Sequence, residues 1–365
     1  MTRVEGRGKS LLPGLWDMHA HYEQAEWGPI YLAAGVTTVR DVGNEFDFIT
    51  AARDAVADGR GVGPRIVAAG VVDGAGPYAL GVERVTDSAS AVTEVKKYHD
   101  AGFQQMKLYS SLTSASVTAI CKEAHRLGMT VTGHIPEGMN AYDGVNDGMD
   151  QINHIQYIYP LMYDSATQAR AGAPIDTGSA AAHRIEAFLV QHRTVLDPTL
   201  SIFEWALHPA NVPLERYEPG VLKLAPQLQA PLENTGTPPT DSAKYNRIFN
   251  DMVLTVAAMH RAGITIVAGT DQVVPGYSLH RELELYVRAG FTPLEAIQAA
   301  TIVPARVMKM DKEVGTVAVG KRADLILVDG DPLTDFSALR RVSLVISKGK
   351  RYLPGPLWES VGFKP

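Results

Sequence analysis

Short runs rich in β-branched residues alternate with longer amphipathic segments along most of the chain. This alternation is typical of βαβ units, which place parallel strands side by side in one sheet. Eight runs are predicted as strands: Leu15–His19, Val36–Arg40, Arg65–Ala69, Gln105–Tyr109, Thr130–His134, Gln151–His154, Thr194–Asp197 and Thr265–Thr270. Because a TIM-type barrel closes with eight parallel strands, we expect an α/β fold built as a (β/α)8 barrel.

Amphipathic helices are predicted between the strands, and each of the clearest ones stops at a glycine. These segments are Phe46–Asp58, Ser90–Ala101, Ser114–Leu127 and Asn246–Ala262, followed by Gly59, Gly102, Gly128 and Gly263. A glycine just past a helix fits the left-handed conformation that ends it. The pattern therefore indicates repeated βα units.

Two connections are unusually long for a compact domain. The first, Tyr157 to His192, follows the sixth predicted strand, and the second, Leu200 to Tyr245, follows the seventh. In a barrel both lie on the face that carries the active site. We favour lids that shape a substrate pocket over plain surface insertions.

The character of the chain changes towards its end. Residues 315–328 and 342–347 are predicted as strands of a small β unit, and the residues before Leu11 are too few to offer it a partner sheet. We therefore expect two parts, a barrel over residues 11–310 and a small, incomplete β unit with a tail over residues 311–365.

The composition narrows the class of protein. With 365 residues, 45% of them hydrophobic, the chain can bury the core of one large domain with a small appendage. A formal net charge of −6 with interspersed charges argues against a nucleic-acid partner, which calls for a basic patch. Cys121 is the only cysteine, so a metal site must use His, Asp, Glu or a modified Lys.

The chain contains no segment that predicts a membrane partner. No apolar run approaches the roughly 18 residues of a membrane span. The polar stretch Met1–Ser10 lacks the apolar core of a signal peptide. We expect a soluble, cytoplasmic protein as given, and leave open an export signal on a longer precursor.

The first predicted strand carries two histidines separated by one residue. Alternate side chains of a strand point to the same face, so His19 and His21 are expected to project side by side. Two neutral imidazoles placed in this way can bind one metal ion. A pair of hydrogen-bonded polar residues at a strand end explains the motif equally well, so the rest of the chain has to supply the context.

Further polar residues follow other predicted strands at the end where barrel enzymes place their catalysis. They are Lys107 in strand four, His134 in strand five, His154 in strand six and Asp271 after strand eight. Each alone has an ordinary alternative: a structural histidine, a helix N-cap for Asp271, or a surface lysine. Together they indicate a metal site, because each falls at the same end of a different strand.

In this order and on these strands, the residues make the chain resemble the amidohydrolase superfamily with a binuclear metal centre. The stretch Leu12–His21 and the tail Gly315–Leu325 are also typical of that superfamily. Within it, the chain is most similar to the imidazolonepropionase-like and Xaa-Pro dipeptidase-like (prolidase-like) branch. True imidazolonepropionases have one metal and no bridging lysine, so Lys107 argues against that activity. Members usually begin with further strands that complete a small β-sandwich, so the resemblance implies an incomplete sandwich here.

The resemblance implies a role for each candidate. His19, His21 and Asp271 would hold one metal ion, and His134 and His154 the second. Lys107 would bridge both ions as a carbamate formed with CO2, because an ammonium would repel them. Asp271 would also be the catalytic residue that takes a proton from the attacking water and passes it to the leaving group. Zinc is the expected metal for nitrogen and oxygen ligands without thiolate, and manganese or cobalt also fit.

Several other residues are candidates for substrate contact. Tyr109 lies two residues after Lys107 and is either an oxyanion donor, as in dipeptidase-like relatives, or a packing residue. Asp41 and Asn44 either bind substrate or, in the case of Asp41, cap a loop or pair with Arg40. Residue Asn153 is expected to point away from His154 and to be structural. Asp197 after strand seven either contacts the ligand or belongs to a turn.

Taken together, we expect a metal-dependent hydrolase that cleaves an amide bond of a small molecule, such as a dipeptide or N-acyl amino acid. Ester, lactone or carbamate hydrolysis is the alternative, because the same hydroxide attacks any of these carbonyls. A metal-binding protein without turnover is less favoured, and deamination or isomerisation fits poorly with an intact Lys107. We also expect a homo-oligomer.

Overall fold

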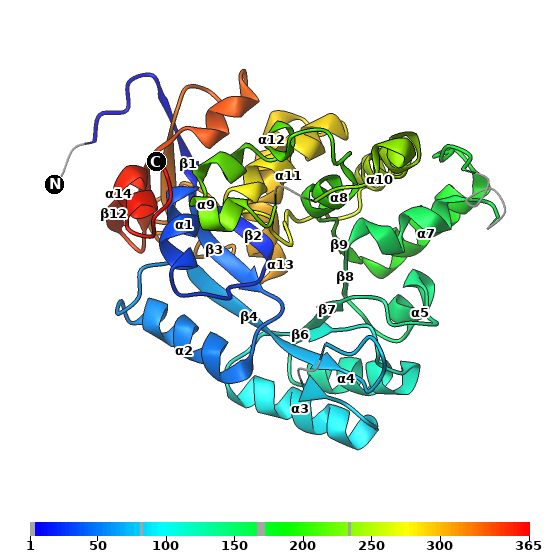
Figure 1. The fold of residues 1–365 in the computed structure, drawn as a ribbon. Helices are drawn as coiled ribbons and strands as arrows, with labels where there is room; N and C mark the ends of the chain where they lie inside the picture. The colour runs from blue at the N-terminus through cyan, green and yellow to red at the C-terminus, as the bar shows by residue number, and fades with distance from the viewer. Residues whose placement is uncertain (1–3, 81–82, 166–171, 233–234) are drawn as a thin grey trace.

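Parallel strands form the centre of the fold (Figure 1). The structure, a computed structural model, describes residues 4–80, 83–165, 172–232 and 235–365. One sheet runs in the order β2-β3-β4-β6-β7 with β5 beside β4, and β8 and β9 form a second parallel pair. These strands are β2 (Leu15–Ala20), β3 (Val36–Asp41), β4 (Arg65–Asp73), β5 (Glu83–Arg84), β6 (Gln105–Leu108), β7 (Thr130–Gly133), β8 (Gln151–Asn153) and β9 (Val195–Asp197).

Backbone hydrogen bonds continue the curl of the sheet beyond these strands. The amide of Asp150, just before β8, donates to Val131 of β7 at 3.0 Å. The eighth predicted strand, Thr265–Thr270, contributes only a bridge between Ile266 and Leu196 of β9. Its Ala268 carbonyl accepts from Met18 of β2 at 2.8 Å, so this segment lies between β9 and β2. Seven of the eight predicted strands are thus confirmed in a curled parallel sheet of an α/β fold.

Helices cover the outside of the curled sheet, and the predicted ones are confirmed with small shifts at their ends (Figure 1). Their bounds are α1 (Trp27–Ala33), α2 (Phe46–Ala57), α3 (Ser88–Asp100), α4 (Ser114–Arg126), α5 (Ala141–Asn146), α7 (Ala180–His192), α8 (Leu200–Leu207), α9 (Pro226–Gln229), α10 (Ser242–Arg261), α11 (Ser278–Arg288), α12 (Pro293–Ala299), α13 (Ile302–Val307) and α14 (Pro354–Glu359). Short 3-10 turns add η1 (Ile155–Tyr157), η2 (Tyr159–Met162), η3 (Leu214–Arg216), η4 (Pro219–Lys223), η5 (Pro239–Asp241) and η6 (Phe336–Arg340).

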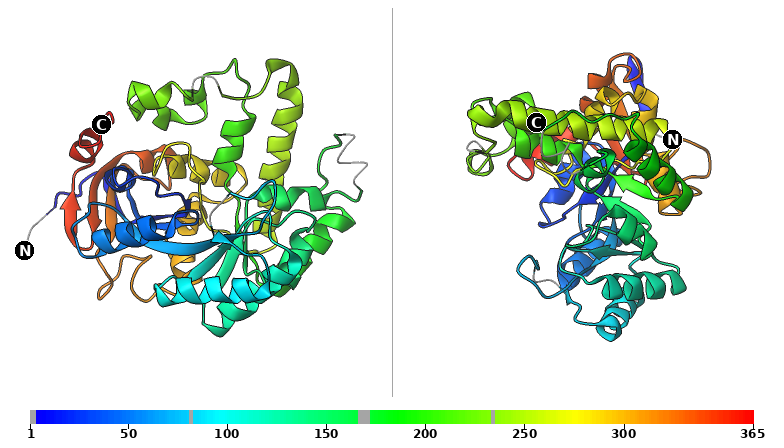
Figure 2. Two further views of the ribbon diagram at one scale, coloured as in Figure 1. Left: turned by 60° about the horizontal axis from the view of Figure 1, so that its bottom comes forward. Right: turned by 90° about the vertical axis from the view of Figure 1, so that its right-hand side faces the viewer.

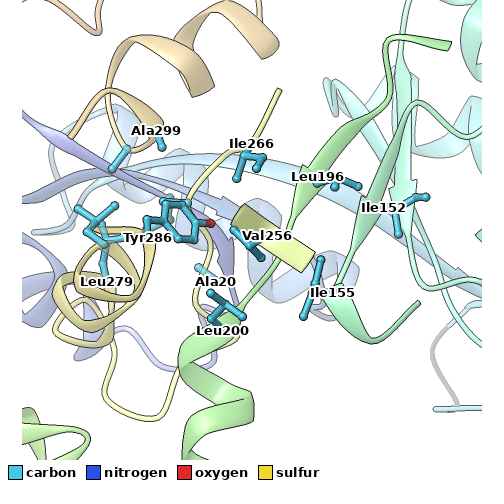
Figure 3. Packing of buried hydrophobic residues seen from close by; sticks show 14 of the residues in the cluster. Ala20, Ile152, Ile155, Leu196, Leu200, Val256, Ile266, Leu279, Tyr286 and Ala299 are labelled. Atoms are coloured by element: carbon cyan, nitrogen blue, oxygen red, sulfur yellow. The ribbon is translucent and has the colours of Figure 1, made fainter. Parts of the chain in front are cut away.

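The main apolar core fills the space between the sheet and these helices. Figure 3 shows the part where Ile152 and Leu196 of the strands and Ile266 meet Val256 of α10 and Tyr286 of α11. All five side chains are at most 5% exposed. Burial of this apolar surface holds the strands that carry the polar residues described below.

A second, antiparallel sheet joins the two ends of the chain. Its order is β1-β10-β11-β12, with β1 (Lys9–Pro13), β10 (Leu325–Asp329), β11 (Val342–Ser347) and β12 (Lys350–Tyr352). The residues before Leu11 were predicted to be too few for a partner sheet, and the structure shows that Lys9 and Ser10 contribute to one strand, β1, where they pair with Asp329 and Val328 of β10. Such a pairing across more than 300 residues leaves no local signal in the sequence.

Both long connections contain helices rather than open loop. The first holds η2 and α7, and residues 166–171 of it lie outside the described residues. The second contains α8 and continues through η3, η4, α9 and η5 to α10, with residues 233–234 outside the described ones. Helices α8 and α10 stand side by side (Figure 2). The segment between them reaches the residues after α14, where Lys364 N donates to Lys223 O at 2.8 Å. Among the described residues, no helix combines the length and the apolar character needed to cross a bilayer.

Candidate metal centre

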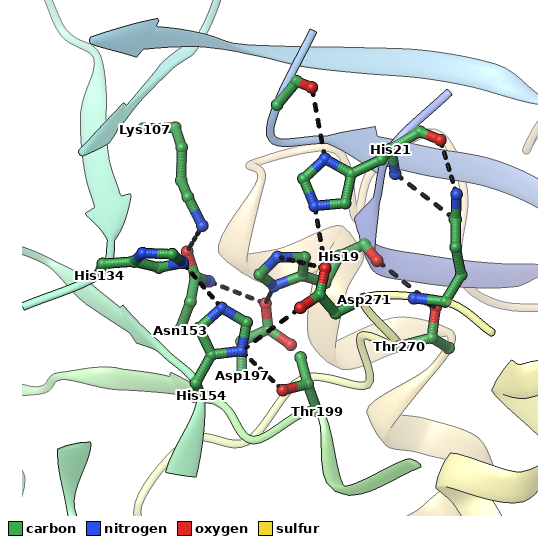
Figure 4. Close-up of polar contacts among 12 residues, drawn as sticks. His19, His21, Lys107, His134, Asn153, His154, Asp197, Thr199, Thr270 and Asp271 are labelled. Carbon is green, nitrogen blue, oxygen red and sulfur yellow. Dashed lines mark hydrogen bonds and ion pairs between the residues drawn. The ribbon is translucent and has the colours of Figure 1, made fainter. Parts of the chain in front are cut away.

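Strand β2 places both histidines of the H-x-H motif at one cluster, as predicted from the alternation of a strand. His21 Nε2 lies 3.0 Å from Asp271 Oδ1, and His19 Nε2 lies 3.7 Å from the same oxygen (Figure 4). The other ring nitrogens face acceptors: His19 Nδ1 lies 2.8 Å from Asp197 Oδ2, and His21 Nδ1 lies 3.3 Å from Gly43 O. These acceptors orient the rings and turn each Nε2 atom towards Asp271, whose carboxylate accepts a hydrogen bond from His21 Nε2.

His134 and His154 form the second half of the cluster. Their Nε2 atoms face each other at 3.0 Å. His134 Nδ1 lies 3.3 Å from Ser110 Oγ, and His154 Nδ1 lies 2.8 Å from Thr199 Oγ1. The same arrangement therefore recurs in all four histidines, with Nδ1 on a neighbouring oxygen and Nε2 towards the centre.

The rings of these histidines are contiguous across the cluster. The centroid of His154 lies 4.7 Å from that of His19 and 4.8 Å from that of His134. The carboxylate of Asp271 also faces His154, with 4.0 Å between Asp271 Oδ2 and His154 Nδ1. No helix begins at Asp271 in the described chain, so the N-cap alternative does not apply to it.

Lys107 projects from β6 into the same cluster (Figure 4). Its side chain is completely buried, and its Nζ donates to Asn153 Oδ1 at 2.7 Å. No carboxylate of the described residues forms an ion pair with it. Burial lowers the pKa of Lys107 to about 7, because Asp271 and Asp197 compensate only in part for the lost hydration.

The electrostatics of the cluster favour neutral imidazoles, the form that binds metals. Burial lowers the pKa of His19, His134 and His154 well below the usual value, and the positive charge of Lys107 lowers each of them further. Burial also acts to lower the pKa of His21, but the hydrogen bond to Asp271 and the negative charges of Asp271 and Asp41 together outweigh it, so the pKa of His21 is raised. For Asp271, burial is outweighed by the neighbouring histidines, which hold its pKa far below the usual range.

The three candidates for substrate contact lie at two places around the cluster. Tyr109 is 7% exposed, and its ring centroid lies 4.5 Å from that of His134. Asp41 is buried at the end of β3, where it accepts from Tyr22 N at 2.7 Å and from Asn44 Nδ2 at 2.6 Å. It does not pair with Arg40, and these contacts match the loop-capping alternative.

Comparison with known proteins identifies the family of the chain. The model of the amidohydrolase family matches residues 31–352, which is most of the chain. The chain belongs to the amidohydrolase family. A stretch of 100 residues is 38% identical to ochratoxinase of Aspergillus niger and covers 26% of this chain but only 21% of that protein. The resemblance predicted from the H-x-H motif and the tail is therefore confirmed.

Solved structures of other members of the amidohydrolase family have a similar fold. A crystal structure of a Xaa-Pro dipeptidase with bound methionine has a TM-score of 0.70 and 24% identity, covering 95% of this chain and 87% of that chain. The crystal structure of Aspergillus niger ochratoxinase has a TM-score of 0.67 and 20% identity, covering 94% of this chain and 83% of that chain. At these identities the likeness concerns the fold.

The donor set fits the divalent metal ions that the family implies. Ligand atoms of His19, His21 and Asp271 all lie within 4.8 Å of one another. Among the described residues, His19 Nε2 is a buried nitrogen without a hydrogen-bond partner. Such an orphaned buried atom calls for an unseen partner, and a cation is one that a lone pair can bind.

Sequence reasoning did not predict the hydrogen-bond network that three buried residues, Arg40, Asn153 and Asp197, form beside the cluster. Asp197 Oδ2 accepts from His19 Nδ1, from Arg40 Nη2 at 2.9 Å and from Asn153 Nδ2 at 2.8 Å. The prediction that Asn153 points away is wrong, because His154 has a φ of 66° and breaks the strand alternation between the two residues. The position of Asp197 at the end of a predicted strand was the one available signal.

Proposed function

We propose that this amidohydrolase family member is a metal-dependent hydrolase that cleaves an amide bond of a small molecule, such as a dipeptide or N-acyl amino acid. The observation that carries the proposal is the convergence of four imidazole Nε2 atoms and the Asp271 carboxylate on one buried cluster (Figure 4). Two metal ions bound there, with zinc expected, would polarise the scissile carbonyl and lower the pKa of an attacking water.

The residues of the chain divide the remaining work. His19, His21 and Asp271 are proposed to hold one ion and His134 and His154 the other, with Lys107 as a carbamate serving both. Complete burial of Lys107 and its lowered pKa support this, because only the uncharged amine reacts with CO2. Asp271 is proposed to accept a proton of the attacking water at a carboxylate oxygen and to return it to the leaving nitrogen.

The architecture proposed for this function is the complete (β/α)8 barrel, in which Thr265–Thr270 takes the place of the eighth strand between β9 and β2. The hydrogen bonds from Leu196 N to Thr265 O at 2.9 Å and from Met18 N to Ala268 O at 2.8 Å support that closure. We propose residues 11–310 as the barrel and 311–365 as the small second part, to which β1 contributes its sheet pairing.

Both long connections are proposed to form part of the substrate pocket, the second through Phe203 and the first through Tyr157. Phe203 of α8 packs edge-on against His154, with ring centroids 6.2 Å apart. The ring centroid of Tyr157 lies 6.0 Å from that of His134 and 6.4 Å from that of His154. Tyr109, Tyr157 and Phe203 thus give the His134–His154 side of the site an aromatic wall.

The test is hydrolysis of a panel of dipeptides, N-acyl amino acids, esters and lactones before and after metal removal. We expect cleavage of at least one amide, its loss after treatment with a chelator, and its return on addition of zinc, because the attacking water depends on bound metal. Amide cleavage that persists in fully chelated protein would contradict metal dependence. Cleavage confined to esters or lactones would contradict the proposed bond type.

A further inference from the structure

Asn153 lies between Lys107 and Asp197 (Figure 4). Asp197 in turn forms a buried ion pair with Arg40. Its side chain is completely buried. Asn153 Oδ1 accepts from Lys107 Nζ at 2.7 Å, and Asn153 Nδ2 donates to Asp197 Oδ2 at 2.8 Å. Three hydrogen bonds therefore run without a break from Lys107 through Asn153 and Asp197 to His19.

The network allows the carboxamide of Asn153 only one orientation. Asp197 Oδ2 is an acceptor that already receives Arg40 Nη2 and faces His19 Nδ1, so it needs the NH2 group of Asn153 and not its carbonyl. A flipped amide would put a carbonyl oxygen against this carboxylate and an NH2 group against Lys107. The carbonyl oxygen of Asn153 must therefore face the nitrogen of Lys107.

We propose that Asn153 is a positioning residue that orients the carboxylated side chain of Lys107, an inference that rests on the carbamate of the proposed function. In carboxylation the lone pair of Nζ forms a bond to the carbon of CO2, an electron pair of a C=O bond moves onto oxygen, and one N–H proton leaves to solvent. The planar product, R–NH–COO⁻, keeps a single N–H.

Among the described residues, the acceptor that Lys107 Nζ hydrogen-bonds is the Oδ1 atom of Asn153, which is therefore placed to receive the remaining N–H. With the N–H fixed there, the carboxylate of the planar carbamate must extend to the opposite side of the nitrogen. Asn153 thus selects one rotamer of the modified side chain. Because the amide is also bonded to Asp197, the position of the carbamate is tied to that of His19.

The proposal is tested with protein prepared in ¹³C-bicarbonate and zinc, by the ¹³C NMR signal of the carbamate and by metal content per chain. We expect Asn153→Leu to reduce the carbamate signal and to weaken binding of the second metal about 10–100-fold, as loss of a residue that orients a metal ligand does. Asn153→Asp keeps the volume but places a carboxylate beside Lys107, which retains the ammonium, so we expect the signal to be lost there as well.

The matched control replaces a completely buried hydroxyl of α10, where Thr255 Oγ1 donates to Asp251 O at 2.8 Å within the helix. This control is Thr255→Val. It should keep both the signal and the metal. An unchanged signal in folded Asn153→Leu and Asn153→Asp would overturn the role of Asn153 alone. If the unsubstituted chain gave no more carbamate signal than Lys107→Ala, the result would overturn the carbamate and this inference with it.

Discussion

Replacement of Asp271 by asparagine lowers kcat for amide hydrolysis about 10²–10⁴-fold, the usual contribution of a positioned general base or acid. The carboxamide keeps the shape of the side chain but cannot accept a proton from water. Asp271 is held for this task by His21 Nε2 at 3.0 Å, which supports an ionised carboxylate at neutral pH.

The measurement is steady-state kinetics on the best amide substrate, together with metal content, because Asp271 is also a proposed ligand. Asp100→Asn is the control, since the side chain of Asp100 is 79% exposed at the C-terminal end of α3 and pairs with His99, which is not a residue of the site. We expect this variant to match the unsubstituted chain. A kcat for Asp271→Asn within a few-fold of the control would remove Asp271 from the proton transfer.

Replacement of Arg40 by methionine destabilises the fold by about 3–5 kcal/mol, the cost of breaking a buried ion pair from one side. Arg40 and Asp197 are both completely buried, 2.9 Å apart. Arg40 also donates to Gln105 Oε1 at 3.0 Å and to Gln151 Oε1 at 2.5 Å. Without the guanidinium, Asp197 is a buried carboxylate whose remaining hydrogen-bond partners, His19 and Asn153, are uncharged.

Urea unfolding of the metal-free chain measures this loss as a shift of the midpoint at constant slope. Arg60→Met is the matched control, because Arg60 pairs with Asp58 at 2.8 Å on the surface, where its side chain is 70% exposed. The control should leave the midpoint unchanged. Equal midpoints for the two variants would show that the Arg40–Asp197 pair contributes nothing to stability.

Local patterns in the sequence correctly predicted the features that a single strand or helix determines. The period of two along β2 correctly placed His19 and His21 on one face. The rule that parallel strands end at one edge brought Lys107, His134, His154 and Asp271 together. Helix ends were predicted from glycines that take left-handed conformations, such as Gly102 with a φ of 82°.

The features that escaped prediction depend on distant partners or on single backbone angles. The pairing of Lys9 with Asp329 and of Arg40 with Asp197 joins residues far apart in the sequence. Asn153 shares the inward face of β8 with Gln151, and the positive φ of His154, which the residue type does not predict, turns His154 towards the same cluster. Sequence reasoning therefore found the residues that face the proposed metals but not the buried network that holds them.

The central claim is most directly tested by elemental analysis of protein prepared with bicarbonate, beside the variant Lys107→Ala. The account predicts about two divalent metals per chain, as in other two-metal hydrolytic sites, and a sharp fall in the variant. Lys107 is proposed to bind metal only as the carbamate. In the described structure its amine donates a hydrogen bond to Asn153 Oδ1. About one metal per chain, unchanged in Lys107→Ala, would contradict the carbamate-bridged pair of ions.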